Sequence, residues 1–195
     1  MTTINIFTTP LFITKVNSTK IKNKMIKKLN NAISKKHTIK ISNEGGAHTV
    51  GFGEDKDLTK LFQEKINEYF TSFNIKKKFE WYICNYWINK NNKGDFNVPH
   101  SHVSEHIQFS GIWYLDVPQN SAKVVFLNPD KTISMGLTYN FFDDPVAYSY
   151  YSVSPENGVL LLFPSNVVHY VQPNLSNQAR ISLAFNISLK EIEWR

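Results

Sequence analysis

Two segments in the first part of the chain have the apolar spacing of amphipathic helices. Between Ser18 and Lys36, apolar residues recur every three or four positions, and Ser18 is of a type that caps helix N-termini. After the glycine-bearing stretch SNEGGAHTVGFGED, a second apolar stripe runs from Leu58 to Phe70, and Asp57 is placed to cap it. The pattern therefore predicts an N-terminal helical region over residues 1–78.

Beyond residue 78 the pattern changes to short runs of aromatic and β-branched residues. Turn signals such as NNKGD, VPQNS, SPENG and QPNLSNQ separate these runs, which is typical of an all-β sandwich or barrel. No repeat or linker divides the chain, so we expect a single domain over residues 1–195 with its β core over 79–190. The expected strands are Phe79–Asn89, Ile107–Val117, Lys123–Leu127, Val146–Val153, Gly158–Phe163, His169–Gln172 and Arg180–Ser188.

The last expected strand, RISLAFNIS, separates apolar from polar side chains. Alternate residues of a strand point to opposite faces. In a barrel covered outside by the two helices, the apolar face would pack on the helices, so the polar face would look into the barrel. A buried arginine there needs an anionic partner, which suggests an acidic ligand. The apolar face holds Ile181, Leu183, Phe185 and Ile187, and the other face holds Arg180, Ser182, Ala184 and Asn186.

Composition and charge exclude several classes of protein. With 42% hydrophobic residues, the 195-residue chain can bury a proper core, and its single cysteine offers no thiolate pair for a metal. The net charge of +6 lies largely in lysines of residues 15–40, while arginine occurs only at Arg180 and Arg195, which disfavours a nucleic-acid role. No signal-peptide pattern or membrane-length apolar run is present, so we expect a soluble, cytoplasmic protein without a membrane partner.

Three of the six histidines lie within seven positions, in NVPHSHVSEHIQFSGIWYL. His100 and His102 are two residues apart, so in an extended chain their rings emerge on the same side and could bind one ion. A third ligand must come from elsewhere, and His169 in LLLFPSNVVHYVQP is the natural candidate. Three ligands on one side of a metal leave positions open, as in non-haem iron oxygenases. Ordinary surface or hydrogen-bonding histidines remain an alternative on spacing alone.

The stretch HVSEH also matches H-x-x-E-H, a pattern of zinc metalloproteases. That pattern works only on a helix, which brings both histidines to one face. Here Gly94 and Pro99 stand shortly before it, and the strand-like IQFSGIWYL follows. The context therefore argues against a metalloprotease.

The ordered series PHSH, SGIWYL, FPSNVVH and RISLAFN resembles the 2-oxoglutarate- and Fe(II)-dependent dioxygenase superfamily, and within it a branch of bacterial and phage oxygenases. The likeness covers roughly residues 80–188. It implies a mainly β fold, a double-stranded β-helix (jelly-roll, cupin-like) with the N-terminal helices packed on one sheet. It also implies an enzyme that uses Fe(II), 2-oxoglutarate and O2, forms succinate, and hydroxylates a primary substrate that the sequence does not identify.

The resemblance also assigns roles to individual residues. The two histidine ligands of the superfamily map to His100 and His169. Its co-substrate arginine maps to Arg180, with Ser182 beside it, and this guanidinium and hydroxyl would bind the distal carboxylate of 2-oxoglutarate. Tyr114, in SGIWYL, could add a hydroxyl contact to the co-substrate or could simply fill the core.

One position departs from the superfamily pattern. Most members have Asp or Glu two residues after the first histidine, whereas this chain has His102. Three neutral histidines can also hold zinc, so the resemblance leaves the metal less certain than the location of the site. Glu105 or Asp95 is an alternative oxygen ligand. Between the ligand regions, the aromatic-rich segment TISMGLTYNFFDDPVAYSYY is expected to include a substrate-covering loop.

Two other functions fit the same pattern. GDFNVPHSHVSE approaches the cupin pattern of a glycine, an H-x-H pair and a glutamate, so a cupin-like metal protein without oxidative activity is one alternative. A non-enzymatic jelly-roll, acting as a binding or structural module, is the other. The oligomeric state has no signature in the sequence.

Overall fold

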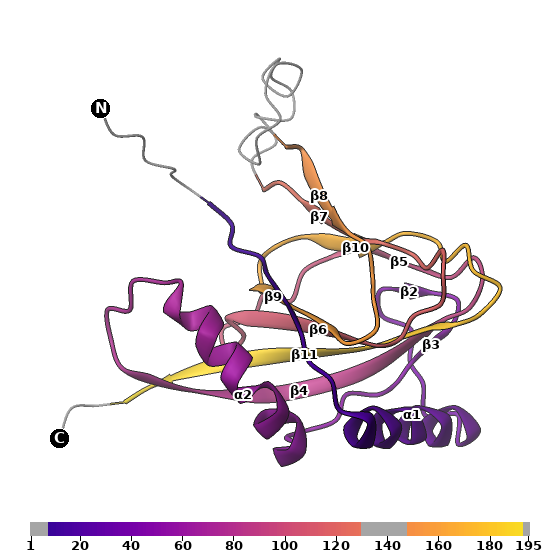
Figure 1. Cartoon of the computed structure of the whole chain (residues 1–195), viewed down its shortest axis with the longest axis horizontal. Helices are drawn as coiled ribbons and strands as arrows, with labels where there is room; N and C mark the ends of the chain where they lie inside the picture. Colours follow the sequence, from indigo (N-terminus) through magenta and orange to yellow (C-terminus); the bar gives the residue numbers. More distant parts are fainter. Residues whose placement is uncertain (1–7, 130–147, 193–195) are drawn as a thin grey trace.

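The computed structural model of the chain describes residues 8–129 and 148–192. Two antiparallel sheets lie face to face, and both helices cover the outer face of the larger sheet (Figure 1). This arrangement confirms the predicted double-stranded β-helix with N-terminal helices on one sheet. Most of the expected substrate-covering segment, residues 132–151, lies outside the described residues.

The larger sheet has six strands and the smaller has five. In spatial order, the six-stranded sheet consists of β1 (Phe12–Lys15), β9 (Val159–Pro164), β6 (Phe109–Asp116), β11 (Arg180–Glu191), β4 (Phe79–Asn91) and β3 (Ala47–His48). The five-stranded sheet consists of β2 (Asn43–Glu44), β5 (Phe96–His100), β10 (His169–Val171), β7 (Val124–Leu127) and β8 (Tyr150–Val153).

The seven strands expected from the sequence correspond to β4 and to β6–β11, with shifted ends, while four strands were not expected. Residues 146–147 of the expected strand at β8 lie outside the described part of the chain. The strands β1, β2, β3 and β5 are short, and β5 contains Pro99, which weakens any local strand signal. They form because neighbouring strands supply a hydrogen-bonding edge.

Both helices begin at capped termini. The Ser18 side chain accepts a hydrogen bond from the backbone N–H of Ile21, which confirms the predicted start of α1 (Thr19–Ser34). The cap of α2 (Lys56–Thr71) is Asp55, so the prediction of Asp57 was wrong. Asp55 has an extended backbone and its carboxylate accepts from two first-turn N–H groups, whereas Asp57 lies inside that turn. Within the described residues, no helix is long and apolar enough to span a bilayer.

The main core lies between the helices and the six-stranded sheet. The apolar face of β11 points into it, as the alternation of RISLAFNIS predicted, through Leu183, Phe185 and Ile187. Phe62 of α2 stacks on Phe185 with ring centroids 5.0 Å apart. A Cβ atom at Gly111 would lie 2.2 Å from Cζ of the Phe185 ring, so only glycine fits there. A second core of aliphatic and aromatic residues fills the space between the sheets.

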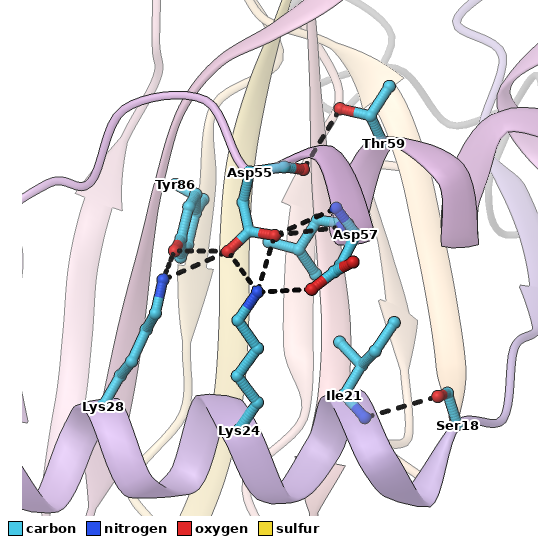
Figure 2. Close-up of polar contacts among 9 residues, drawn as sticks. Ser18, Ile21, Lys24, Lys28, Asp55, Asp57, Thr59 and Tyr86 are labelled. Carbon is cyan, nitrogen blue, oxygen red and sulfur yellow. Dashed lines mark hydrogen bonds and ion pairs between the residues drawn. The ribbon is translucent and has the colours of Figure 1, made fainter.

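A charged cluster joins the two helices to the sheet, and we call Asp55, Lys24, Lys28 and Tyr86 the Asp55 cluster. Figure 2 shows both lysines of α1 reaching the Asp55 carboxylate, with Tyr86 of β4 beside them. The Nζ atoms of Lys24 and Lys28 lie 3.0 and 3.1 Å from this carboxylate, and the Tyr86 hydroxyl lies 3.3 Å from it. Lys28 also donates to the Tyr86 hydroxyl. Partial burial opposes ionisation of Asp55, but hydrogen bonds from the two lysines prevail and lower its pKa to about 2.

Candidate metal centre and co-substrate pocket

The structure brings His100, His102 and His169 together. His100 of β5 is the cross-strand partner of His169 on β10, and His102 follows just after the end of β5. The ring nitrogens that could bind a metal all lie within 4.8 Å of one another. The ring centroids of His100 and His169 are 4.4 Å apart, and that of His102 lies 5.1 and 5.2 Å from them. Two imidazoles close in sequence and a third distant one thus converge on one point.

Hydrogen bonds fix the orientation of two of these rings. Nδ1 of His100 lies 2.7 Å from the carbonyl oxygen of Val98, and Nδ1 of His169 lies 3.0 Å from that of Val167. Because a carbonyl only accepts, Nδ1 carries the proton in both rings and the Nε2 lone pair stays free. This is the arrangement found in most metal-binding histidines.

Burial keeps the three rings neutral. It lowers the pKa of His100, and it lowers that of His102 to about 3 and that of His169 to about 4, with further repulsion from neighbouring imidazoles. Neutral rings can donate lone pairs to a metal. Within the described residues, no carboxylate joins this group. Of the alternative oxygen ligands, Glu105 is exposed and Asp95 accepts hydrogen bonds from Asn92.

The histidines line one part of a cavity between the two sheets, and Arg180, Ser182 and Tyr114 line it as well. Arg180 is 2% exposed, and its guanidinium donates to the Ala122 carbonyl at 3.2 Å and to Asn91 Oδ1 at 3.0 Å. Its Nε has no partner, and no carboxylate of the described residues pairs with it. Burial lowers the pKa of this arginine, yet a guanidinium stays charged in proteins. We call this space the Arg180 cavity.

Unpartnered polar atoms mark the Arg180 cavity as a place for a polar ligand. The Tyr114 hydroxyl is fully buried and has no hydrogen-bond partner among the described residues, and the Arg180 guanidinium carbon lies 5.7 Å from the centroid of its ring. The Asn89 Oδ1 atom, on the same cavity, is also buried and unpartnered. Such atoms are costly unless something binds them. The donor set therefore fits a metal at the histidines and an anion at the arginine.

The sequence reading missed three residues near this site. Trp87 and Asn89 of β4 line the cavity, and His48 of β3 packs its ring on Trp87. The alternation in YICNYWINKN indicates this placement. Tyr86 and Ile88 face the core under the helices, so the alternate residues Trp87 and Asn89 face the opposite side, toward the cavity between the sheets.

A family model matches the part of the chain that contains the three histidines and Arg180. The model of a protein family described as "Putative 2OG-Fe(II) oxygenase" matches residues 85–186. No curated protein matches the sequence. The motifs HxH, distal histidine and R-x-S all fall inside the matched span.

Solved structures share the fold at low sequence identity. A Pseudomonas putida prolyl-4-hydroxylase is 13% identical, with a TM-score of 0.62 over 93% of each chain. The viral collagen prolyl hydroxylase of Paramecium Bursaria Chlorella virus-1, solved as a 2OG complex, is 13% identical, with a TM-score of 0.55 over 91% of this chain and 94% of that one. The carbocyclase SnoK of nogalamycin biosynthesis is 11% identical, with a TM-score of 0.62 over 93% and 81%.

The span matched by the family model covers more than half of the chain, from the middle of β4 to the middle of β11. It contains the three histidines, Tyr114, Arg180 and Ser182. The fold, the histidine group and the family match agree, and the chain belongs to the 2-oxoglutarate- and Fe(II)-dependent oxygenase family.

Proposed function

We propose that the protein is a dioxygenase that hydroxylates a primary substrate and converts 2-oxoglutarate to succinate and carbon dioxide. One observation carries this proposal: a cluster of three neutral imidazoles and a buried arginine without a carboxylate partner line the same cavity. A metal ion and a dicarboxylate together satisfy both groups.

In this proposal His100, His102 and His169 hold Fe(II). The chemistry that the bound metal supplies is oxidation by O2, coupled to decarboxylation of the keto acid. The carbonyls of Val98 and Val167 keep the protons of His100 and His169 on Nδ1, so that Nε2 can bind the metal.

Arg180 in this proposal binds the distal carboxylate of 2-oxoglutarate. Its Nε–H has no partner, and a carboxylate would neutralise a cation that is otherwise paired only with neutral oxygens. The hydroxyl of Tyr114 supplies a second donor, since it is buried, unpartnered and next to the guanidinium. Ser182, two residues along β11 and on the same face, is a third. These groups orient the co-substrate.

An anaerobic titration tests the proposal. Fe(II) and then 2-oxoglutarate are added to the protein, and we expect the weak visible charge-transfer band of the iron-bound keto acid. Arg180→Ala should lose the band at the same 2-oxoglutarate concentration, while Lys190→Ala, an exposed cation on the same strand, should retain it. If the wild-type protein shows no band with both ligands, the proposal is wrong.

Admission of oxygen separates the alternatives. The proposed oxygenase makes succinate from 2-oxoglutarate even without its primary substrate, although slowly. A cupin-like metal protein would bind the metal but form no succinate. A non-enzymatic jelly-roll would retain no metal, and His169→Ala would then change nothing.

A further inference from the structure

His102 is held differently from the other two histidines. His100 and His169 lie on strands, and each is oriented through Nδ1 by the carbonyl of the residue two positions before it. The His102 ring makes no hydrogen bond to any residue that the structure describes. Its backbone is fixed, because its N–H donates to the carbonyl of Ser165 at 2.8 Å. Among the described residues, only packing by neighbouring side chains therefore restricts rotation of the His102 ring about its side-chain bonds.

The indole of Trp87 supplies that packing. Its ring centroid lies 5.3 Å from that of His102, with a tilt of 42° between the planes. Trp87 comes from β4 in the opposite sheet, is 9% exposed and lines the Arg180 cavity. The indole ring at this distance limits the orientations that the His102 ring can adopt.

Trp87 is itself firmly placed. Its backbone pairs with Ala184 in the long β4–β11 ladder. The His48 ring stacks on it at 5.7 Å with only 15° between the planes. The Nδ1 atom of His48 lies 2.8 Å from the Thr49 carbonyl, which fixes the His48 ring in turn. The six-stranded sheet thus holds Trp87 rigidly against His102.

We propose that Trp87 is a positioning residue that orients His102 toward the metal, in the role that backbone carbonyls play for His100 and His169. This inference rests on the proposed function, because it needs a metal at the histidines. Groups that orient a metal ligand commonly change metal affinity by 10–100-fold. It also predicts that the tryptophan acts through His102 and not through the site as a whole.

Binding of Co(II) to the purified metal-free protein tests this without any turnover. Trp87→Ala should weaken Co(II) binding about tenfold and shift the visible ligand-field bands of the bound ion. Trp87→Phe keeps an aromatic face against His102, so it should restore most of the affinity and the wild-type spectrum. Trp81→Ala is the matched control, since Trp81 lies on the same strand and donates to Asn67 instead, and it should change neither.

A double-mutant cycle shows whether the effect passes through position 102. In a His102→Ala background, adding Trp87→Ala should change Co(II) affinity by less than about twofold, because no ring remains to be oriented. An equal loss in both backgrounds, or wild-type affinity in Trp87→Ala, would overturn the inference and leave the proposed function standing. Failure of the wild-type protein to bind Co(II) would overturn both. Thermal unfolding of each metal-free variant shows that it is folded.

Discussion

The Asp55 cluster and the Arg180 cavity differ in whether a buried charged group has a counter-charge within the described chain. In the Asp55 cluster, each lysine nitrogen lies within 3.1 Å of a carboxylate oxygen, and helix N–H groups satisfy that carboxylate further (Figure 2). In the Arg180 cavity, among the residues that the structure describes, the cation contacts only neutral oxygens and the Tyr114 hydroxyl has no partner. The first arrangement is complete in the chain alone and holds the helices to the sheet. The second is complete only with a ligand.

This difference shows that stability is lower at the Arg180 cavity, where a ligand is needed to complete the interactions. A buried charge without its counter-charge lowers the stability of the folded state. Removing a charged group should therefore have different consequences in the two regions. We expect a large loss of stability at Asp55 and a loss of ligand binding at Arg180.

The largest effect is expected for Asp55→Ala. It removes the α2 cap and the counter-charge of Lys28, and it leaves Lys24 paired with Asp57 alone, so the free energy of unfolding should fall by about 3 kcal/mol. Urea unfolding followed by circular dichroism measures it. Asp57→Ala is the control, because the exposed Asp57 pairs only with Lys24, and it should cost less than about 1 kcal/mol. Equal losses would contradict a special role for Asp55.

Arg180→Met should separate stability from binding. Methionine removes the unpaired charge but also the donor to the oxygens of Ala122 and Asn91. These two effects oppose each other, so the free energy of unfolding should change by less than about 1 kcal/mol. The affinity for 2-oxoglutarate, measured by calorimetry on Co(II)-loaded protein, should fall about 100-fold, or about 2.7 kcal/mol. If Arg180→Met unfolds easily but binds 2-oxoglutarate with normal affinity, Arg180 contributes to stability and not to ligand binding, which would contradict this prediction.

Acid should weaken the Asp55 cluster within a defined pH window. The pKa of Asp55 is 3.8 in the unfolded reference and about 2 in the folded protein, so the unfolded state takes up the proton first as pH falls. This carboxylate contributes about 2 kcal/mol of stability above pH 4, and that contribution is lost as pH falls toward 2. Urea midpoints from pH 6 to pH 2 measure the loss. Asp55→Asn, which can still cap α2, should show a correspondingly shallower decline.

The smallest effect is expected for Tyr114→Phe. It removes a buried hydroxyl without a partner, so the metal-free protein should keep its stability or gain about 0.5 kcal/mol. Binding of 2-oxoglutarate should weaken about tenfold, because one donor to the carboxylate is lost. Calorimetry and urea unfolding of the same preparation measure both. A clear loss of stability would show that the hydroxyl has a partner in the folded chain.

Local pattern sufficed for the parts of the fold that local chemistry decides. The alternation of RISLAFNIS separated Leu183 and Phe185 from Arg180 and Ser182 correctly. The capping preference of serine located the start of α1. The candidate histidines were also predictable, since spacing singled out the pair His100 and His102 and the resemblance mapped the superfamily's ligands to His100 and His169. The structure brings all three together.

Long-range contacts were beyond the reach of the pattern. Asp55 and Asp57 are equally good caps by type. They differ in the structure because the backbone of Asp55 is extended and because Lys28 of α1 pairs with Asp55. The strand β5 contains a proline and forms because β10 and β2 lie beside it. Trp87 meets His102 across the two sheets, a contact that no sequence spacing encodes.

The pairing of His100 with His169 on neighbouring strands has a consequence for exchange of the metal. The strand β10 is only three residues long, so its hydrogen-bonded ladder with β5 is short and opens easily at its ends. An ion held by both rings would tie these strands together across a gap of more than sixty residues in the chain. Amide hydrogen exchange along β10 should therefore slow when metal binds, and fraying of this ladder would set an upper limit on how long the ion stays.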